Sequence, residues 1–253
     1  MISALCLDQD WPVVWFDEID STNTEAHRRA SSGERGPVSL VGRVQTAGKG
    51  RLGRQWLSGS GNLYSTALVP LDGMSADVPC MALSVALAVR DAVVDLSNGL
   101  VIPGLKWPND VRIDGAKLCG ILLESGLTPS RDYWLAIGIG INLAHAPSVD
   151  NYETISLVDA GGGLKTPEEA IAVLNQTLKK RLKHQLHAGR SSIIRDWMDA
   201  TDQKGKRCAA QHGSERVEGL YHGLDEFGQL QIKQDDGKII TITAGDVDMV
   251  KGR

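Results

Sequence analysis

The hydrophobic pattern of the chain changes near residue 205, and this change limits the fold more than any other feature. Before it, strand-like runs such as Pro12–Phe16 and Val38–Val44 alternate with segments of helical periodicity. After it, only short strand-like runs occur: Glu215–Tyr221, Gln229–Gln234 and Lys238–Thr243. We therefore predict an α+β chain, with a mixed β-sheet packed with helices over residues 1–204 and a small β-barrel over residues 205–253.

Local signals predict where several of the elements begin and end. Thr22 and Glu25 have the spacing of a capping box, which places a helix N-terminus at Ser21-Thr22-Asn23. Thr166, followed by Pro167 and Glu169, predicts the start of a second helix, which we expect to stop at Gly189. Further predicted elements are a buried helix at Cys80–Leu96, a short helix at Ser192–Met198, and strands at Asn62–Val69, Val101–Trp107 and Trp134–Leu143.

Charge and cysteine content narrow the function classes. The net charge of −4 gives the chain no overall attraction to nucleic acid. Its four cysteines form no CxxC pair and no zinc-like spacing, which fits a reducing compartment. The N-terminal segment MISALCLDQDWP lacks the basic region of a signal peptide, and the longest apolar stretch, Met81 to Val94, is interrupted by charges. We therefore expect a cytoplasmic protein that does not enter a membrane.

The segment from Gly42 to Tyr64 is the most informative for function. It contains six glycines together with the cations Arg43, Lys49, Arg51 and Arg54, and no acid occurs between Glu34 and Asp72. Glycine lets the backbone approach a ligand closely, and the cations can bind phosphate or carboxylate. The segment is neither a GxxxxGK[ST] loop nor a strand–GxGxxG–helix unit, so it predicts a different kind of anion-binding loop. Trp56 fits two roles, an aromatic cover for adenine or a core residue.

A second segment, Lys106 to Ser125, combines a charged turn with a predicted hairpin. The turn Lys106–Asp110 carries a cation, an aromatic ring, an amide and a carboxylate. Asp114-Gly115 predicts a two-residue hairpin turn, and Lys117 follows two residues after it on the next strand. A single lysine on a hairpin is usually solvated, but two donor-rich segments beside turns suggest a shared ligand.

Other candidate residues favour structural roles. His184 and His187 have a spacing that permits metal binding, but lysines and an arginine surround them, which favours a solvated face. Cys119 lies in an apolar strand and is typical of core filling. The sequence contains neither GxSxG nor HExxH, so we expect a metal only as Mg²⁺ bound with a nucleotide.

Taken together, these segments resemble the biotin protein ligases over about Trp15 to Val250. The matching motifs are the loop Gly48–Arg54 with Trp56 and Ser58, the intact turn Lys106–Asp110 with Lys117 and Gly120, the early Ser21-Thr22-Asn23, and the late Gly138–Asn142. The last β segment resembles the SH3-like domain of this family. Lys49 and Leu52 stand where the family often has arginine, so a bidentate contact and a cation are lost. Ser21 lies so early that the N-terminal DNA-binding module of some members has no room, and DNA binding is not expected.

The resemblance implies a ligase that forms biotinyl-5′-AMP from biotin and ATP, with Mg²⁺, and then transfers biotin to a carrier-domain lysine of a biotin-dependent carboxylase. It implies Lys117, Arg51 and Arg54 as catalytic residues and Asp110 as a Mg²⁺ contact. It implies biotin binding by Ser21, Thr22, Asn23, Gln45, Lys49, Gly50, Arg51, Lys117 and Gly120. It implies ATP binding by Arg51, Arg54, Trp56, Lys106, Asn109, Lys117 and Asn142. The open edges of the sheet would permit a homodimer without requiring one.

Two alternatives remain open at this stage. A lipoate or octanoate ligase or transferase has a related fold, and a transferase would use a thiol such as Cys119 beside Lys117. A non-enzymatic biotin or nucleotide sensor would keep the binding site but lack the reaction. Pyrophosphate exchange with biotin and then with octanoate separates these alternatives.

Overall fold

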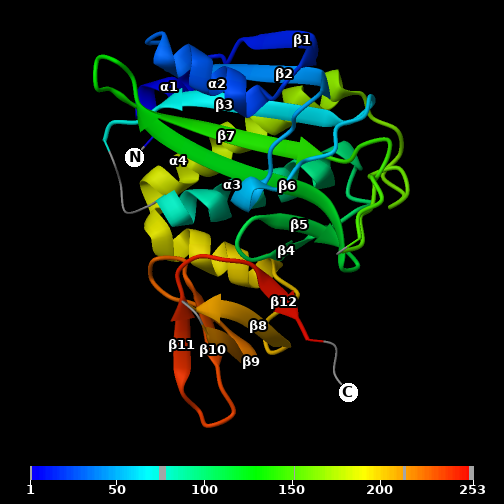
Figure 1. Cartoon of the computed structure of the whole chain (residues 1–253), viewed down its shortest axis with the longest axis vertical. Helices are drawn as coiled ribbons and strands as arrows, with labels where there is room; N and C mark the ends of the chain where they lie inside the picture. Colours follow the sequence, from blue (N-terminus) through cyan, green and yellow to red (C-terminus); the bar gives the residue numbers. More distant parts are fainter. Residues whose placement is uncertain (1, 74–77, 151, 213–214, 251–253) are drawn as a thin grey trace.

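The computed structural model describes residues 2–73, 78–150, 152–212 and 215–250. Its larger sheet has seven strands in the order β1-β2-β3-β7-β6-β5-β4 (Figure 1). The strands are β1 (Val13–Ile19), β2 (Val38–Gln45), β3 (Leu63–Pro70), β4 (Gly104–Lys106), β5 (Asp110–Ile113), β6 (Ala116–Leu127) and β7 (Tyr133–Ile141). Strands β1 and β2 are parallel, whereas β2 pairs antiparallel with β3. The predicted mixed sheet is therefore confirmed.

The helices cover both faces of this sheet. They are α1 (Ala4–Asp8), α2 (Thr22–Ser31), α3 (Val78–Leu96) and α4 (Pro167–Ala200), with a 3₁₀ turn η1 (Arg51–Gly53) in the glycine-rich segment. Alternate residues of β3 point to opposite faces. Ala67 and Val69 belong to the large core that includes α3 and α4, whereas Leu68 packs in the smaller core under α2. Strand β3 is thus buried on both faces.

The helix signals in the sequence had different outcomes. Thr166 is the N-cap of α4, as predicted, and forms a capping box with Glu169, whose N–H donates to Thr166 Oγ1 at 3.2 Å. The capping box predicted at Thr22 is wrong. Ser21 is the N-cap residue of α2, and its side chain forms no capping hydrogen bond. The Thr22 hydroxyl donates instead to Gln45 Oε1 on β2. Gly189 has a φ of 73° and kinks α4, which then continues through the predicted last helix.

The strand predicted at Val101–Trp107 is shorter in the structure, where β4 has three residues. Pro103 has no N–H to donate to a neighbouring strand. Its carbonyl accepts a hydrogen bond from Arg90 Nε at 3.0 Å, so this part of the chain packs against α3 instead.

The C-terminal segment forms a second, five-stranded antiparallel sheet. Its order is β11-β10-β9-β8-β12, and Figure 1 shows it beside the end of α4. The strands are β8 (Arg207–His212), β9 (Glu215–Leu224), β10 (Leu230–Lys233), β11 (Ile239–Ile242) and β12 (Val247–Met249). Strands β8 and β12 were not predicted. Because β11 and β12 are edge strands among the described residues, a closed barrel stays a prediction, as does a domain boundary after residue 204.

Buried polar contacts join the second sheet to the rest of the molecule. The Trp107 indole N–H donates to the Gly228 carbonyl at 3.0 Å. Trp197, at the end of α4, lies with its indole nitrogen 3.4 Å from the Tyr221 hydroxyl. The sheet is therefore held against the end of the larger sheet that carries the charged turn. Within the described residues, no helix combines the length and apolar character needed to cross a bilayer.

Candidate active site

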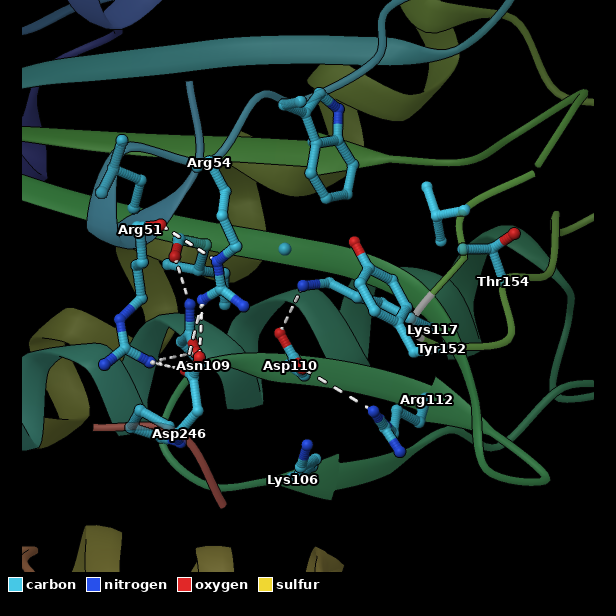
Figure 2. A pocket seen from close by; sticks show the side chains of 18 of the residues that line it. Arg51, Arg54, Lys106, Asn109, Asp110, Arg112, Lys117, Tyr152, Thr154 and Asp246 are labelled. Carbon is cyan, nitrogen blue, oxygen red and sulfur yellow. Dashed lines mark hydrogen bonds and ion pairs between the residues drawn. The ribbon is translucent and has the colours of Figure 1, made fainter. Parts of the chain in front are cut away.

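A cavity of about 1250 Å³ brings the two segments singled out in the sequence together. It reaches from the start of α2, past the glycine-rich segment and the turn between β4 and β5, to the second sheet, and Figure 2 shows its charged part. Of the predicted site residues, only Asn142 does not line this cavity. Lining residues that were not predicted include Arg112, Tyr152, Thr154, Lys206 and Asp246.

One end of the cavity is uncharged and rich in hydrogen-bonding groups. Gln45 Oε1 accepts hydrogen bonds from the Thr22 N–H at 2.8 Å and from the Thr22 hydroxyl at 3.1 Å. The Gln45 amide nitrogen donates to Ser58 Oγ at 3.0 Å. The orientation of this amide is therefore set from both ends, by α2 and by the segment that follows the loop.

Asn23 is held just as firmly on the floor of this end. Its Nδ2 donates to Glu124 Oε2 at 2.8 Å, and its Oδ1 lies 2.6 Å from the Thr66 hydroxyl. The side chain rests on the backbone of Gly138, where an added Cβ would lie only 2.1 Å from Asn23 Oδ1. A glycine is thus required on β7 at this point.

Lys117 reaches the cavity from the predicted hairpin. Asp114 and Gly115 have φ values of 49° and 87°, the left-handed pair that a tight two-residue turn requires. The Lys117 ammonium lies 2.7 Å from Asp110 Oδ1, and the two side chains are only 15% and 16% exposed. Its backbone is braced, because the Lys117 N–H donates to the Glu153 carbonyl and its carbonyl accepts from the Ile155 N–H.

Asn142 lies beneath the cavity and supports the backbone contact between Lys117 and Ile155. It is 1% exposed, and its Nδ2 lies 3.4 Å from the Lys117 carbonyl and 3.3 Å from the Ile155 carbonyl. Its Oδ1 is buried without a hydrogen-bond partner among the described residues. Asn142 therefore acts on the site through Lys117.

Trp56 lies at the centre of the cavity against two glycines of the sheet. A Cβ on Gly120 or Gly140 would come within 2.7 Å or 2.5 Å of its ring. The Lys117 ammonium is 5.5 Å from the centre of the indole ring and 5.4 Å from that of Tyr152. The partly buried ring is therefore a wall of the cavity and contacts the cation electrostatically.

The arginines of the glycine-rich segment are paired with protein groups. Arg51 donates to Asn109 Oδ1 at 2.8 Å and to the Gly245 carbonyl at 3.1 Å. Arg54 lies 3.0 Å from Asp246 Oδ2 (Figure 2). Burial lowers the pKa of the Arg51 guanidinium. The Lys49 side chain is exposed, and the backbone of Lys49 forms an isolated β-bridge with that of Gln55.

Two further cations lie on the strands below Lys117. Lys106 pairs in register with Asp110, and Arg112 follows two residues later on the same face of β5. The signal for Arg112 was present, because alternate residues of a strand share a face. Burial, and next the charge of Arg112, lower the pKa of Lys106.

The weaker candidates have the structural roles that the sequence favoured. Cys119 is fully buried, and burial raises the pKa of its thiol. His184 Nε2 lies 2.9 Å from Ser192 Oγ, and His187 Nδ1 lies 2.7 Å from the Lys183 carbonyl. In the described part of the chain, no group of three or more His, Cys, Asp or Glu side chains could hold a metal ion.

The fold and the cavity define a class of α+β protein in which a recess lined by cations lies next to an uncharged, hydrogen-bonding one. Residues 15–142 match the model of the Biotin/lipoate A/B protein ligase family, and residues 205–250 match the Biotin protein ligase C terminal domain. The chain belongs to the biotin/lipoate A/B protein ligase family.

Individual relatives agree with this assignment. A biotin--[acetyl-CoA-carboxylase] ligase of Paracoccus denitrificans is 32% identical over 87% of this chain and 93% of its own length. A ligase of the same name from Mycobacterium tuberculosis is 30% identical over 90% of this chain and 85% of its own. The structure of an Aquifex aeolicus biotin protein ligase in complex with biotin and ATP is 25% identical, with a TM-score of 0.80 over 94% of this chain and 99% of that one.

Proposed function

We propose that the chain is an ATP-dependent biotin protein ligase. It forms biotinyl-5′-AMP from biotin and ATP and transfers biotin to a lysine of the carrier domain of a biotin-dependent carboxylase. One observation carries this proposal: Lys117 lies in a single cavity with the arginines of a glycine-rich loop and with a preorganised polar end at Thr22 and Gln45. Relatives named as biotin ligases match nearly the whole chain.

The chemistry of the first half-reaction requires this arrangement of charges. The biotin carboxylate attacks the α-phosphate of ATP, the bond to the β-phosphate breaks, and pyrophosphate leaves. Two anions must therefore come together in line. Lys117 stands where a cation can lie between them, and Arg51 and Arg54 can bind phosphate oxygens.

The second half-reaction transfers biotin from the mixed anhydride to the carrier domain. The carrier lysine amine attacks the carbonyl of the mixed anhydride, and AMP leaves with the electron pair of the broken bond. The uncharged end of the cavity suits the biotin ring system, because a cyclic urea has both N–H donors and a carbonyl acceptor. Ser21, Thr22, Asn23 and Gln45 supply the matching groups there.

We assign the remaining roles as follows. Lys49, Gly50 and Gly120 border biotin, and Trp56, Lys106 and Asn109 border ATP. Mg²⁺ enters with the nucleotide, with Asp110 as its protein contact, because phosphate oxygens and water supply most of the ligands of such an ion. All four cysteines are buried and none forms a disulfide, which supports a cytoplasmic location. We further propose that the second sheet is an SH3-like barrel domain from residue 205, and that an open sheet edge permits a homodimer.

Pyrophosphate exchange tests the proposal directly. Labelled pyrophosphate should enter ATP when biotin is present, but not with octanoate at the same concentration. Biotin should then be found on an added carrier domain. Exchange that depends on octanoate would indicate a lipoate-type ligase, and biotin binding without exchange would indicate a sensor. The buried Cys119 thiol, whose pKa is raised, argues against a thiol-dependent transferase.

A further inference from the structure

Two partly buried cations on the floor of the cavity lack the close partners that Lys117, Arg51 and Arg54 have. Arg112 is 17% exposed, and its nearest carboxylate oxygen, Asp110 Oδ2, is 4.0 Å from its Nη2. Its Nε is buried without a hydrogen-bond partner. Within the described ranges, the Lys106 ammonium has no hydrogen bond and no ion pair within 4.0 Å. A buried cation without a partner is costly, because desolvation is not offset.

The strand register explains why these charges accumulate at one place. Lys106 lies opposite Asp110, and Arg112 lies opposite Lys117. Three cations therefore share this floor with Asp110, and Figure 2 shows Lys106 and Arg112 below this carboxylate. Asp246 and Asp248 also act on the charge of Lys106, but neither forms an ion pair with it within 4.0 Å. Asp110 is already bonded to Lys117 at 2.7 Å. Among the described residues, Lys106 and Arg112 are consequently left without an ion pair shorter than 4.0 Å on this floor.

The two arginines of the glycine-rich loop differ from Lys106 and Arg112 in having close partners. These arginines are bonded to Asn109, the Gly245 carbonyl and Asp246, so a ligand must displace a protein group to reach them. Lys106 and Arg112 need no such exchange. They are therefore the cations best prepared for a small polyanion that enters the recess.

Resting on the proposed function, we propose that Lys106 and Arg112 form the subsite for the leaving diphosphate, that is, the β- and γ-phosphates of ATP and then free pyrophosphate. When the bond between the α-phosphorus and the bridging oxygen breaks, its electron pair stays on that oxygen, which belongs to the β-phosphate. Charge therefore grows on the diphosphate, and fixed cations stabilise it. The planar guanidinium of Arg112 can bind two phosphate oxygens, which a lysine cannot do.

The alternative occupant is an acidic side chain of a docking carrier domain. The burial of Arg112 and the partial burial of Lys106 favour the small anion, because a protein side chain would have to reach the floor of the recess. The experiment distinguishes the two occupants.

The test uses the full chain with the substitution Arg112→Gln. Losing a charge-assisted contact should raise both the inhibition constant for inorganic pyrophosphate and the KM for ATP by roughly 10- to 100-fold. The dissociation constant for biotin should change less than about threefold, because the polar end of the cavity is untouched. Arg112→Lys should restore part of the loss. Arg216→Gln is the matched control, since Arg216 is exposed on β9, bonds Glu218 and does not line the cavity.

Calorimetric titration of inorganic pyrophosphate into the protein without other substrates separates this proposal from the proposed function. If the wild type forms no biotinyl adenylate, the proposed function fails, yet weaker pyrophosphate binding by Arg112→Gln alone would still support the subsite. Unchanged pyrophosphate binding in a folded Arg112→Gln variant overturns it. It is also overturned if the variant raises only the KM for the carrier domain, because the cations would then dock a protein.

Discussion

The glycine-rich loop and the β5–β6 hairpin face the same cavity but are built in opposite ways. On the hairpin, Lys117 is braced by backbone hydrogen bonds from residues 153–155, and its side chain is 15% exposed. In the loop, Arg54 is 53% exposed, and the regular structure is confined to one 3₁₀ turn and a short bridge. The sheet thus fixes one cation in place, whereas we expect the loop to gain order when it binds a ligand.

This difference assigns separate tasks to the two regions. A preorganised charge lowers a barrier most when it needs no rearrangement during the reaction, which favours the hairpin for the chemical step. A glycine-rich loop loses more conformational entropy on ordering, but it can open for entry and close over the intermediate. We therefore expect hairpin variants to change the rate and loop variants to change binding and retention.

The largest effect should follow from Lys117→Ala. Adenylation, measured as biotin-dependent pyrophosphate exchange, should fall by at least ~10²-fold, because a fixed charge between two anions is lost. The thermal midpoint should change little, because Arg112, 4.0 Å from Asp110, remains to offset the charge of this carboxylate. Lys183→Ala, which removes a surface lysine bonded to Asp8, is the control. Exchange within about threefold of the wild type would refute the role of Lys117.

A smaller effect is expected from Gly138→Ala on β7, beneath the uncharged end of the cavity. The new Cβ would collide with Asn23 Oδ1, which must then leave Thr66 and Glu124. Such overpacking costs about 1–3 kcal/mol, so biotin affinity should fall by roughly 10-fold or more. Gly59→Ala is the matched control, because nothing lies within 4 Å of its added Cβ. Equal biotin affinity in the two variants would mean that the contact between Asn23 and β7 is not rigid.

How much the sequence could predict also differs between the two regions. The turn of the hairpin was predicted, because Asp114-Gly115 is a local signal that needs no tertiary information. The two motifs likewise predicted most of the cavity. The contact between Arg54 and Asp246 could not be predicted, since it joins residues 192 positions apart in the chain. Strands β8 and β12 were not predicted for a related reason. They are short, and they are stabilised by pairing with each other, which a local pattern does not reveal.

The failed capping box shows how a tertiary contact can replace a local one. Thr22 has the residue type and spacing of a cap, yet Gln45 on β2 binds both its N–H and its hydroxyl. The local rule therefore located the start of α2 correctly but gave the wrong reason. Thr22 departs from the capping rule at the polar end of the cavity. Departures from local rules are expected at functional sites.

The comparison between the regions can also be tested by amide hydrogen exchange. Adding biotin and ATP should slow exchange in residues 46–61 by about 10-fold or more, because the loop pays its ordering cost on binding. Amides of β5 and β6 should change much less, since they are already hydrogen-bonded in the sheet. Equal protection in both regions with and without ligands would show that the loop is as preformed as the hairpin.

The smallest effect concerns Asp246, the carboxylate of the second sheet that holds the loop. It lies 3.0 Å from Arg54 and 3.6 Å from Arg51, so phosphates must compete with it for the same guanidinium groups. Asp246→Asn should therefore tighten ATP binding. The gain should be modest, about 2- to 5-fold in the dissociation constant, because Asp246 is 40% exposed and such pairs contribute roughly 0.2–1 kcal/mol. Asp235→Asn, which removes an exposed carboxylate bonded to Arg207, is the control of equal charge. Weaker ATP binding by Asp246→Asn would mean that the carboxylate positions the arginines and does not compete with the phosphates.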